Sequence, residues 1–156
     1  MEESGNPQGI PVVVLHGGPG GGCSPALRCF FDPQRFRIIL FDQRGAGQSR
    51  PLASIEDNTL SHLLADLEQI RQALHVERWM VFGGSWGATL ALAYLAAFPQ
   101  HITGMVLRGL FLCRHQDLDW LYTEAGAARM FPPARPALPQ QGPPGNGRLP
   151  AADSEG

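Results

Sequence analysis

Apolar residues in the first 110 positions gather in four short runs, with longer polar or helical stretches between them. The runs cover residues 10–15, 36–41, 79–82 and 102–107, and they are rich in Val, Ile, Leu and Phe. Continuous apolar runs of this length, without strict alternation, are typical of strands buried on both faces of a sheet. Each run is therefore predicted to be a strand.

Helical patterns lie between these runs. Leu and Ile recur at spacings of three and four across residues 59–75, with charged side chains between them, which predicts an amphipathic helix. Residues 88–98 are almost all apolar or small and stop at Pro99, which predicts a helix buried on most sides. A short helix is predicted over residues 25–31. The alternation predicts an α/β fold with a mostly parallel, doubly wound sheet and right-handed crossovers.

The character of the chain changes after residue 131. Residues 132–156 hold 7 of the 14 prolines and no aromatic residue. Such a segment cannot bury enough apolar surface to offset the entropy lost on ordering, so we expect residues 132–156 to be a disordered Pro/Gly-rich tail.

Composition narrows the chemistry. The net charge is −2, and all 12 basic residues are Arg, so lysine-dependent sites such as a P-loop or a Schiff base are excluded. Three scattered cysteines form neither a disulfide framework nor a zinc site. The first residues lack the charged and apolar pattern of a leader peptide, and no apolar run approaches about 20 residues, so we expect neither a leader nor a membrane span. We expect a cytoplasmic protein that acts on small molecules or peptides, with no nucleic-acid or membrane partner.

The strongest chemical signal is Gly83-x-Ser85-x-Gly87, which fits the G-x-S-x-G nucleophile elbow. It lies between a predicted strand and a predicted helix, as that motif requires. The sharp turn would hold Ser85 exposed at the carboxyl end of the sheet. The following helix would place backbone N–H groups and the positive end of its dipole beside a developing oxyanion. Ser85 is therefore the candidate nucleophile.

A second glycine-rich loop begins at His16 and Gly17, directly after the first predicted strand. Loops of the H-G-G type donate the other oxyanion N–H in such sites. The predicted oxyanion hole consists of the backbone N–H groups of Gly18 and Trp86. His16 and Gly17 are expected to shape the loop, because His16 precedes the nucleophile in the chain.

Other polar residues are expected to have structural roles. Asp42 and Arg44 lie in a glycine-punctuated loop after the second strand, where local hydrogen bonding is favoured over substrate contact. No G-x-G-x-x-G motif suggests a dinucleotide site. The remaining histidines have no metal-ligand spacing. The residues therefore favour neither a dinucleotide site nor a histidine metal site.

The combination HGGPGGG, DQRGxGxS and GGSWG, in this order, resembles the prolyl aminopeptidase (proline iminopeptidase) family of α/β-hydrolases. Further similar stretches bring the resemblance to about residues 5–131. The resemblance implies a cytoplasmic serine peptidase that releases N-terminal proline from small peptides without a cofactor. It also implies a partial α/β-hydrolase core over residues 1–110 and the start of a helical cap over residues 111–131.

Against that family pattern, the chain looks truncated at both ends. The opening hairpin strands expected before Gly5 are missing, and so are the rest of the cap and the C-terminal strands. The composition break near residue 131 suggests a shifted reading frame, which resequencing the locus would test.

In this fold the triad runs in the order Ser, Asp or Glu, His. Its acid and base are expected on later loops that this chain lacks, so the fragment is expected to be inactive. A makeshift triad of Asp117 or Asp119 with His101 or His115 is a remote alternative. Two other interpretations stay open: an esterase or amidase of the same fold, and a non-catalytic fragment. Epoxide and haloalkane hydrolases are disfavoured because they carry Asp at the elbow.

Overall fold

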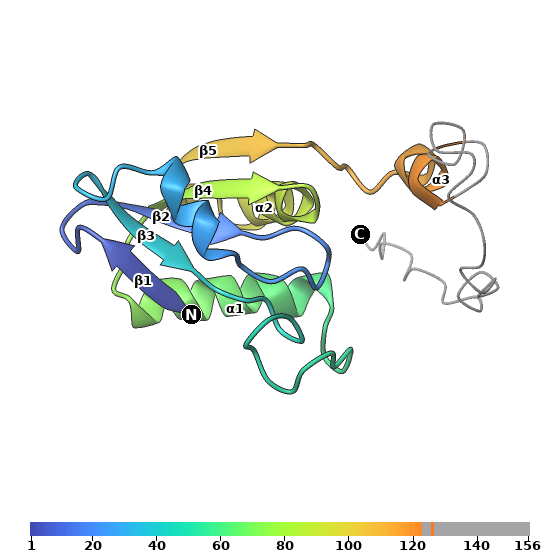
Figure 1. Ribbon diagram of the computed structural model, residues 1–156, viewed down its shortest axis with the longest axis horizontal. Helices are drawn as coiled ribbons and strands as arrows, with labels where there is room; N and C mark the ends of the chain where they lie inside the picture. The colour runs from blue at the N-terminus through green and yellow to red at the C-terminus, as the bar shows by residue number, and fades with distance from the viewer. Residues whose placement is uncertain (123–125, 127–156) are drawn as a thin grey trace, which may run out of the picture. The chain divides into compact units, whose positions relative to one another are not determined.

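The first 117 residues fold around one sheet. The computed structural model describes residues 1–122 and residue 126, and it places Met1–Asp117 in one compact unit. Within the described residues the sheet has five strands (Figure 1), which are β1 (Glu2–Gly5), β2 (Ile10–Leu15), β3 (Phe36–Leu40), β4 (Trp79–Gly84) and β5 (Ile102–Arg108).

The strand order is β1-β3-β2-β4-β5, and every neighbouring pair from β3 to β5 is parallel. The four strands predicted from the apolar runs are present, with ends that differ by at most two residues. The mostly parallel sheet of an α/β fold is therefore confirmed. Because parallel strands share a direction, the loops that follow β2, β3 and β4 meet at one edge of the sheet.

β1 is a strand that the hydrophobic pattern does not reveal. It pairs antiparallel with β3, and Glu3 forms an ion pair with Arg37 on that strand at 2.7 Å. One strand is therefore present where the sequence predicted that the opening hairpin strands are missing. Its polar sequence, Glu-Glu-Ser-Gly, forms a strand because it pairs at the sheet edge, where both faces need not be apolar.

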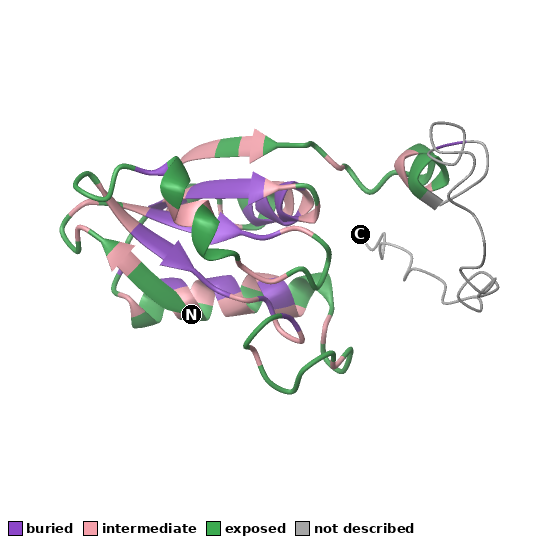
Figure 2. Cartoon of the chain, in the orientation of Figure 1, coloured by how far each residue is buried: buried purple, intermediate pink, exposed green. Residues whose placement is uncertain are grey.

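Two helices cover one face of the sheet. These are α1 (Leu60–Ala73), which begins at the N-cap Thr59, and α2 (Trp86–Ala97), which follows β4 directly. Leu67 of α1 and Leu90 and Tyr94 of α2 are fully buried against Val13 of β2. The buried residues are concentrated in the central strands and the sheet-facing side of these helices (Figure 2).

The other face is covered by the β2–β3 connection, which contains the short 3₁₀ helix η1 (Pro25–Phe30). The Phe31 ring packs edge-on against Phe82 of β4, with ring centroids 5.4 Å apart. The helices predicted over 59–75 and 88–98 are confirmed, and the short helix near 25–31 is a 3₁₀ helix. The connections thus lie on both faces, as a doubly wound sheet requires.

A buried polar cluster joins α1 to α2 and to the 3₁₀ helix η2 (Pro99–His101). Glu68 Oε1 accepts the Tyr94 hydroxyl at 2.5 Å and lies 2.9 Å from His101 Nδ1, while Arg71 donates to both Glu68 oxygens. The Arg71 hydrogen bonds lower the pKa of Glu68 to about 2, against an opposing contribution from burial. Hydrogen bonds to the ionised carboxylate therefore stabilise the packing of both helices.

α3 (His115–Tyr122) follows β5 and falls within the segment expected to begin a cap. The boundary of the first compact unit lies inside this helix, after Asp117. The cap assignment of residues 111–131 stays a prediction, and the tail predicted over 132–156 lies outside the described residues. None of the helices in the described part of the chain has the length and apolarity to cross a membrane.

Candidate active site

Ser85 stands at the junction of β4 and α2, as the motif predicts. Its backbone has φ 56° and ψ −121°, a positive φ that residues with a side chain rarely adopt. Its N–H donates to the Arg108 carbonyl oxygen at the end of β5, at 3.1 Å. The residue is exposed at the edge where the β2, β3 and β4 loops meet. A strained, exposed serine at this edge is the geometry of a nucleophile elbow.

The glycines of the motif are required by close backbone approaches. A Cβ on Gly83 would overlap the carbonyl oxygen of Gly87, and a Cβ on Gly87 would overlap that of Leu15. Gly17 lies against the serine itself, since a Cβ there would stand 3.3 Å from Ser85 Cβ. The first glycine-rich loop and the elbow are therefore in direct contact.

Backbone donors and a cavity adjoin the serine. Trp86 is the first residue of α2, where a helix leaves its N–H groups without intrahelical partners. The Gly17–Gly18 peptide lies on the neighbouring loop, whose Gly17 faces Ser85. A cavity of about 370 Å³ is lined by Ser85, Gly17, Arg108 and further residues that include Leu27 and Phe82. The space beside Ser85 is large enough for a small amino-acid side chain.

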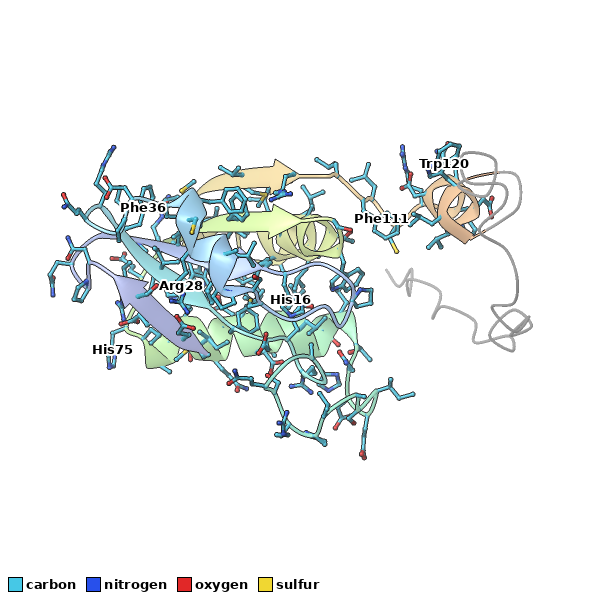
Figure 3. The ribbon with its side chains drawn as sticks, viewed as in Figure 1. His16, Arg28, Phe36, His75, Phe111 and Trp120 are labelled. Carbon is cyan, nitrogen blue, oxygen red and sulfur yellow. The ribbon has the colours of Figure 1, made fainter. Side chains whose placement is uncertain are left out.

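His16 is buried at the end of β2 (Figure 3), where it holds the glycine-rich loop. Its Nδ1 lies 2.9 Å from the Gly17 oxygen, and its Nε2 accepts the Gln43 N–H at 3.0 Å. This pattern defines the neutral tautomer with the proton on Nδ1. His16 is thus engaged on both ring nitrogens by the loops and is not directed to Ser85.

Gln43 is a residue of the site that sequence reasoning missed. Its side chain is 3% exposed and bridges two loops. Its amide nitrogen donates to the His16 carbonyl oxygen at 2.9 Å, and its amide oxygen accepts the Trp86 indole N–H at 3.0 Å. The only available signal was its place between Asp42 and Arg44, because a polar residue in a loop does not reveal burial.

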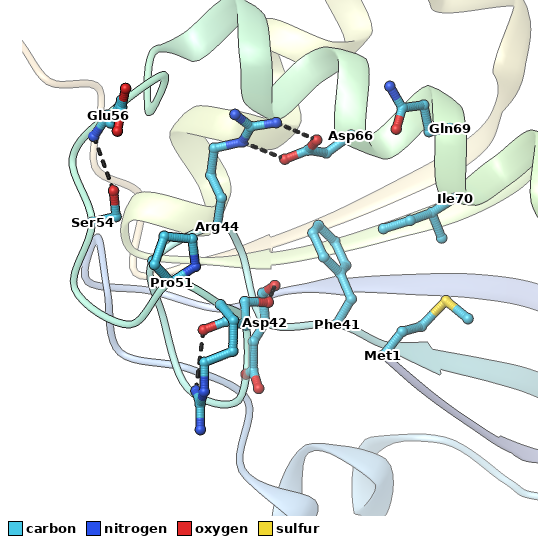
Figure 4. A pocket seen from close by; sticks show the side chains of 13 residues that line it. Met1, Phe41, Asp42, Arg44, Pro51, Ser54, Glu56, Asp66, Gln69 and Ile70 are labelled. Atoms are coloured by element: carbon cyan, nitrogen blue, oxygen red, sulfur yellow. Dashed lines mark hydrogen bonds and ion pairs between the residues drawn. The ribbon is translucent and has the colours of Figure 1, made fainter.

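Asp42 and Arg44 form hydrogen bonds both within their own loop and to other elements of the described residues. Asp42 accepts the backbone N–H groups of Gln48 and Cys23, which lower the pKa of its carboxyl despite the opposing effect of burial. Arg44 makes a two-pronged ion pair with Asp66 of α1 at 2.7 and 2.8 Å. This pair lines a separate hollow of about 420 Å³ (Figure 4). Both residues thus have the contacts of loop-fixing groups.

A catalytic base for Ser85 is not found among residues 1–122. Within residues 1–122 no side chain forms a hydrogen bond with Ser85 Oγ. His101 precedes β5, whereas Ser85 follows the parallel strand β4, so the two lie at opposite edges of the sheet, about 20 Å apart at ~3.3 Å per residue. The makeshift triad is therefore wrong for His101, which binds Glu68 instead.

The makeshift triad with His115 as its base gains no support either. Asp117 binds the side chain and N–H of its neighbour Arg114, and His115 begins α3. In the described part of the chain, no group of three His, Cys, Asp or Glu residues could hold a metal ion. The described residues therefore hold a serine elbow beside a glycine-rich loop, but no side chain that forms a hydrogen bond with the Ser85 hydroxyl.

Comparison with known proteins agrees with this arrangement. A model of the α/β-hydrolase fold family matches residues 10–141. The match covers most of the chain and spans strands β2 to β5 and the serine elbow, so the chain belongs to the α/β-hydrolase family.

Within that family the chain is related to the proline iminopeptidases, as its motifs predict. The enzyme of that name from Xylella fastidiosa (strain Temecula1) is 57% identical over 133 residues, which are 85% of this chain and 42% of that protein. The solved structure of a proline iminopeptidase-related protein from Thermus thermophilus matches with a TM-score of 0.58 and 35% identity, over 67% of this chain and 38% of that one.

The fold itself is shared more widely. An esterase from Rhodococcus sp. ECU1013 matches with a TM-score of 0.59 and 28% identity, over 71% of this chain and 41% of that one. The chain spans less than half the length of the relatives it matches. Because an esterase shares the fold, the fold does not decide the substrate. The sequence relationship, by contrast, is to the proline iminopeptidases.

Proposed function

We propose that this chain carries the nucleophile half of a serine peptidase that releases N-terminal proline from small peptides. The observation that carries the proposal is the backbone of Ser85, whose strained φ of 56° exposes its hydroxyl beside a glycine-rich loop. The relationship to proline iminopeptidases supplies the substrate class.

In the proposed reaction Ser85 Oγ attacks the carbonyl carbon of the N-terminal proline. The negative charge that develops on the carbonyl oxygen is stabilised by the backbone N–H groups of Gly18 and Trp86 and by the N-terminus of α2. Such donors stabilise the transition state more than the substrate, because the charge exists only there.

Ser85 needs a base to accept its proton as it attacks. A serine hydroxyl without one is a poor nucleophile, and triads stripped of their members retain only about 10³–10⁴-fold catalysis over water. No described side chain forms a hydrogen bond with Ser85 Oγ, so we expect the chain by itself to hydrolyse prolyl substrates very slowly or not at all. We expect turnover when the C-terminal part of a relative supplies the acid and the base.

The test is hydrolysis of a prolyl arylamide by two proteins. One is the 156-residue chain, and the other is a fusion of residues 1–122 to the C-terminal part of the Xylella fastidiosa relative. Ser85→Ala should abolish turnover in the fusion. Ser61→Ala, which changes an exposed serine on α1, should leave it intact.

Three outcomes would contradict the proposal in different ways. A folded fusion that retains activity after Ser85→Ala would rule out Ser85 as the nucleophile. A fusion that cleaves aryl esters but no prolyl amide would instead favour the esterase interpretation. Turnover by the short chain itself, lost in Ser85→Ala, would show that it contains its own base.

A further inference from the structure

Three loops meet at the carboxyl edge of the sheet, and one buried side chain joins them. Gln43 follows β3, His16 follows β2, and Trp86 follows β4, so the residues come from three adjacent strands. From the loop after β3, the Gln43 side chain reaches past the end of β2 to Trp86, which follows β4. Its two hydrogen bonds, 2.9 Å to the His16 oxygen and 3.0 Å from the Trp86 indole, link the other two loops.

Both of these loops carry a donor of the proposed oxyanion hole. Gly18 lies two residues beyond His16, and the Trp86 backbone N–H belongs to the residue whose indole Gln43 holds. The separation of the two donors therefore depends on how firmly the glycine-rich loop is held to the elbow. We propose that Gln43 is a positioning residue that fixes this separation without contacting the substrate. The proposal rests on the proposed function of Ser85.

Packing alone does not fix the Trp86 ring. The indole packs against the main core on one side, but a hollow of about 350 Å³ borders Trp86 and Gln43 on the other. Apolar side chains of the 51–60 segment also line this hollow, among them Ile55, which is 90% exposed. The hydrogen bond from the indole to Gln43 is therefore what defines the ring orientation on that side.

The burial of Gln43 makes the link specific. A buried donor or acceptor left without its partner is unfavourable, so the amide is held in one orientation by its two partners. The Gln43 backbone N–H adds a third bond, to His16 Nε2. A catalytic displacement of about 1 Å can cost roughly 100-fold in rate, which is why this bridge matters for the oxyanion hole.

The first test compares Gln43→Met with the wild-type chain by ¹H–¹⁵N NMR. Methionine keeps the length of the side chain and removes both amide functions. We expect the Trp86 indole N–H signal to move upfield, and the residual dipolar couplings of the Gly18 and Trp86 amides to change. The amides of the buried strands β2 and β4 should keep theirs. Gln69→Met, at an exposed position of α1, is the matched control and should change neither.

Gln43→Glu separates the two halves of the bridge. Its carboxylate can still accept the Trp86 indole N–H but opposes the His16 carbonyl oxygen, so only the Gly18 couplings should change. Burial raises the pKa of a carboxyl, and the protonated form can donate to His16 again. Acidification should therefore restore the wild-type Gly18 couplings. If Gln43→Met unfolds, this variant carries the same comparison.

The second test follows modification of Ser85 by a fluorophosphonate in the fusion of residues 1–122 to the C-terminal part of the Xylella fastidiosa relative, which supplies a base. We expect Gln43→Met to slow labelling by about 10- to 100-fold, the effect of displacing one oxyanion donor. A folded fusion that does not label counts against the proposed function, while the NMR comparison still decides the role of Gln43. Unchanged couplings in folded Gln43→Met, or changed couplings with unchanged labelling, would overturn the proposal.

Discussion

The carboxylate of Glu68 should govern how this fold responds to acid. It is 13% exposed at the side chain and accepts hydrogen bonds from Arg71, Tyr94 and His101. Replacing it by Gln keeps the shape but removes the charge that these donors share. We predict that Glu68→Gln lowers the free energy of unfolding at pH 5.5 and makes it less dependent on pH.

The magnitude follows from the pKa of Glu68, which the Arg71 hydrogen bonds lower from 4.5 to about 2. A carboxyl whose pKa is depressed on folding stabilises the folded state above its unfolded pKa, and that contribution is lost as the pH falls towards the folded value. The full contribution is about 3 kcal/mol at about 1.4 kcal/mol per tenfold change in proton affinity. By the same relation, about 2 kcal/mol should be lost between pH 5.5 and pH 3.

Urea unfolding followed by far-ultraviolet circular dichroism measures this at both pH values. The stability difference between wild type and Glu68→Gln should shrink by about 2 kcal/mol from pH 5.5 to pH 3, because other carboxyls titrate equally in both proteins. Glu56→Gln, at an exposed loop position, serves as the control and should track the wild type. A difference that stays constant across this range would refute the assignment of a charged Glu68 to the cluster.

Two further predictions concern the site loops. Gly87→Ala should prevent folding or lower the free energy of unfolding by more than about 3 kcal/mol, because the added methyl overlaps the backbone carbonyl at the end of β2. Gly104→Ala places its methyl in open space and should change the free energy of unfolding little. Equal urea midpoints for the two variants would contradict this prediction. Burial, followed by the Asp42 charge, raises the pKa of Cys23 to about 11. Iodoacetamide at pH 8 should therefore modify the exposed Cys29 and Cys113 before Cys23. If mass spectrometry finds Cys23 alkylated as fast as these two, the prediction is wrong.

The sequence was sufficient for the central strands and the elbow, for an identifiable reason. Strands buried on both faces must be apolar throughout, so residues 10–15 and 79–82 stand out from the loops around them. The glycines of the elbow are also readable, because close backbone approach at Gly83 and Gly87 leaves no room for a side chain. Requirements of this kind restrict which residue type can stand at a single position, so they can be recognised in the sequence.

Features that depend on distant partners were not readable in this way. β1 is polar and becomes a strand only by pairing with β3, and Gln43 acquires its place from His16 and Trp86 on other strands. Glu68 fits the polar face of an amphipathic helix, yet it binds residues of α2 and η2. A periodicity describes one element at a time, so bonds between elements remain outside it.

The bond that holds Ser85 sets an order of events during synthesis. The unfavourable backbone of the serine costs about 1–3 kcal/mol, and its N–H is bound by the carbonyl of Arg108, at the far end of the last strand in the sheet. A growing chain can therefore complete β2, β3 and β4 before the serine is locked in its working conformation. Protection of the Ser85 amide from hydrogen exchange is accordingly a direct measure of whether β5 has docked.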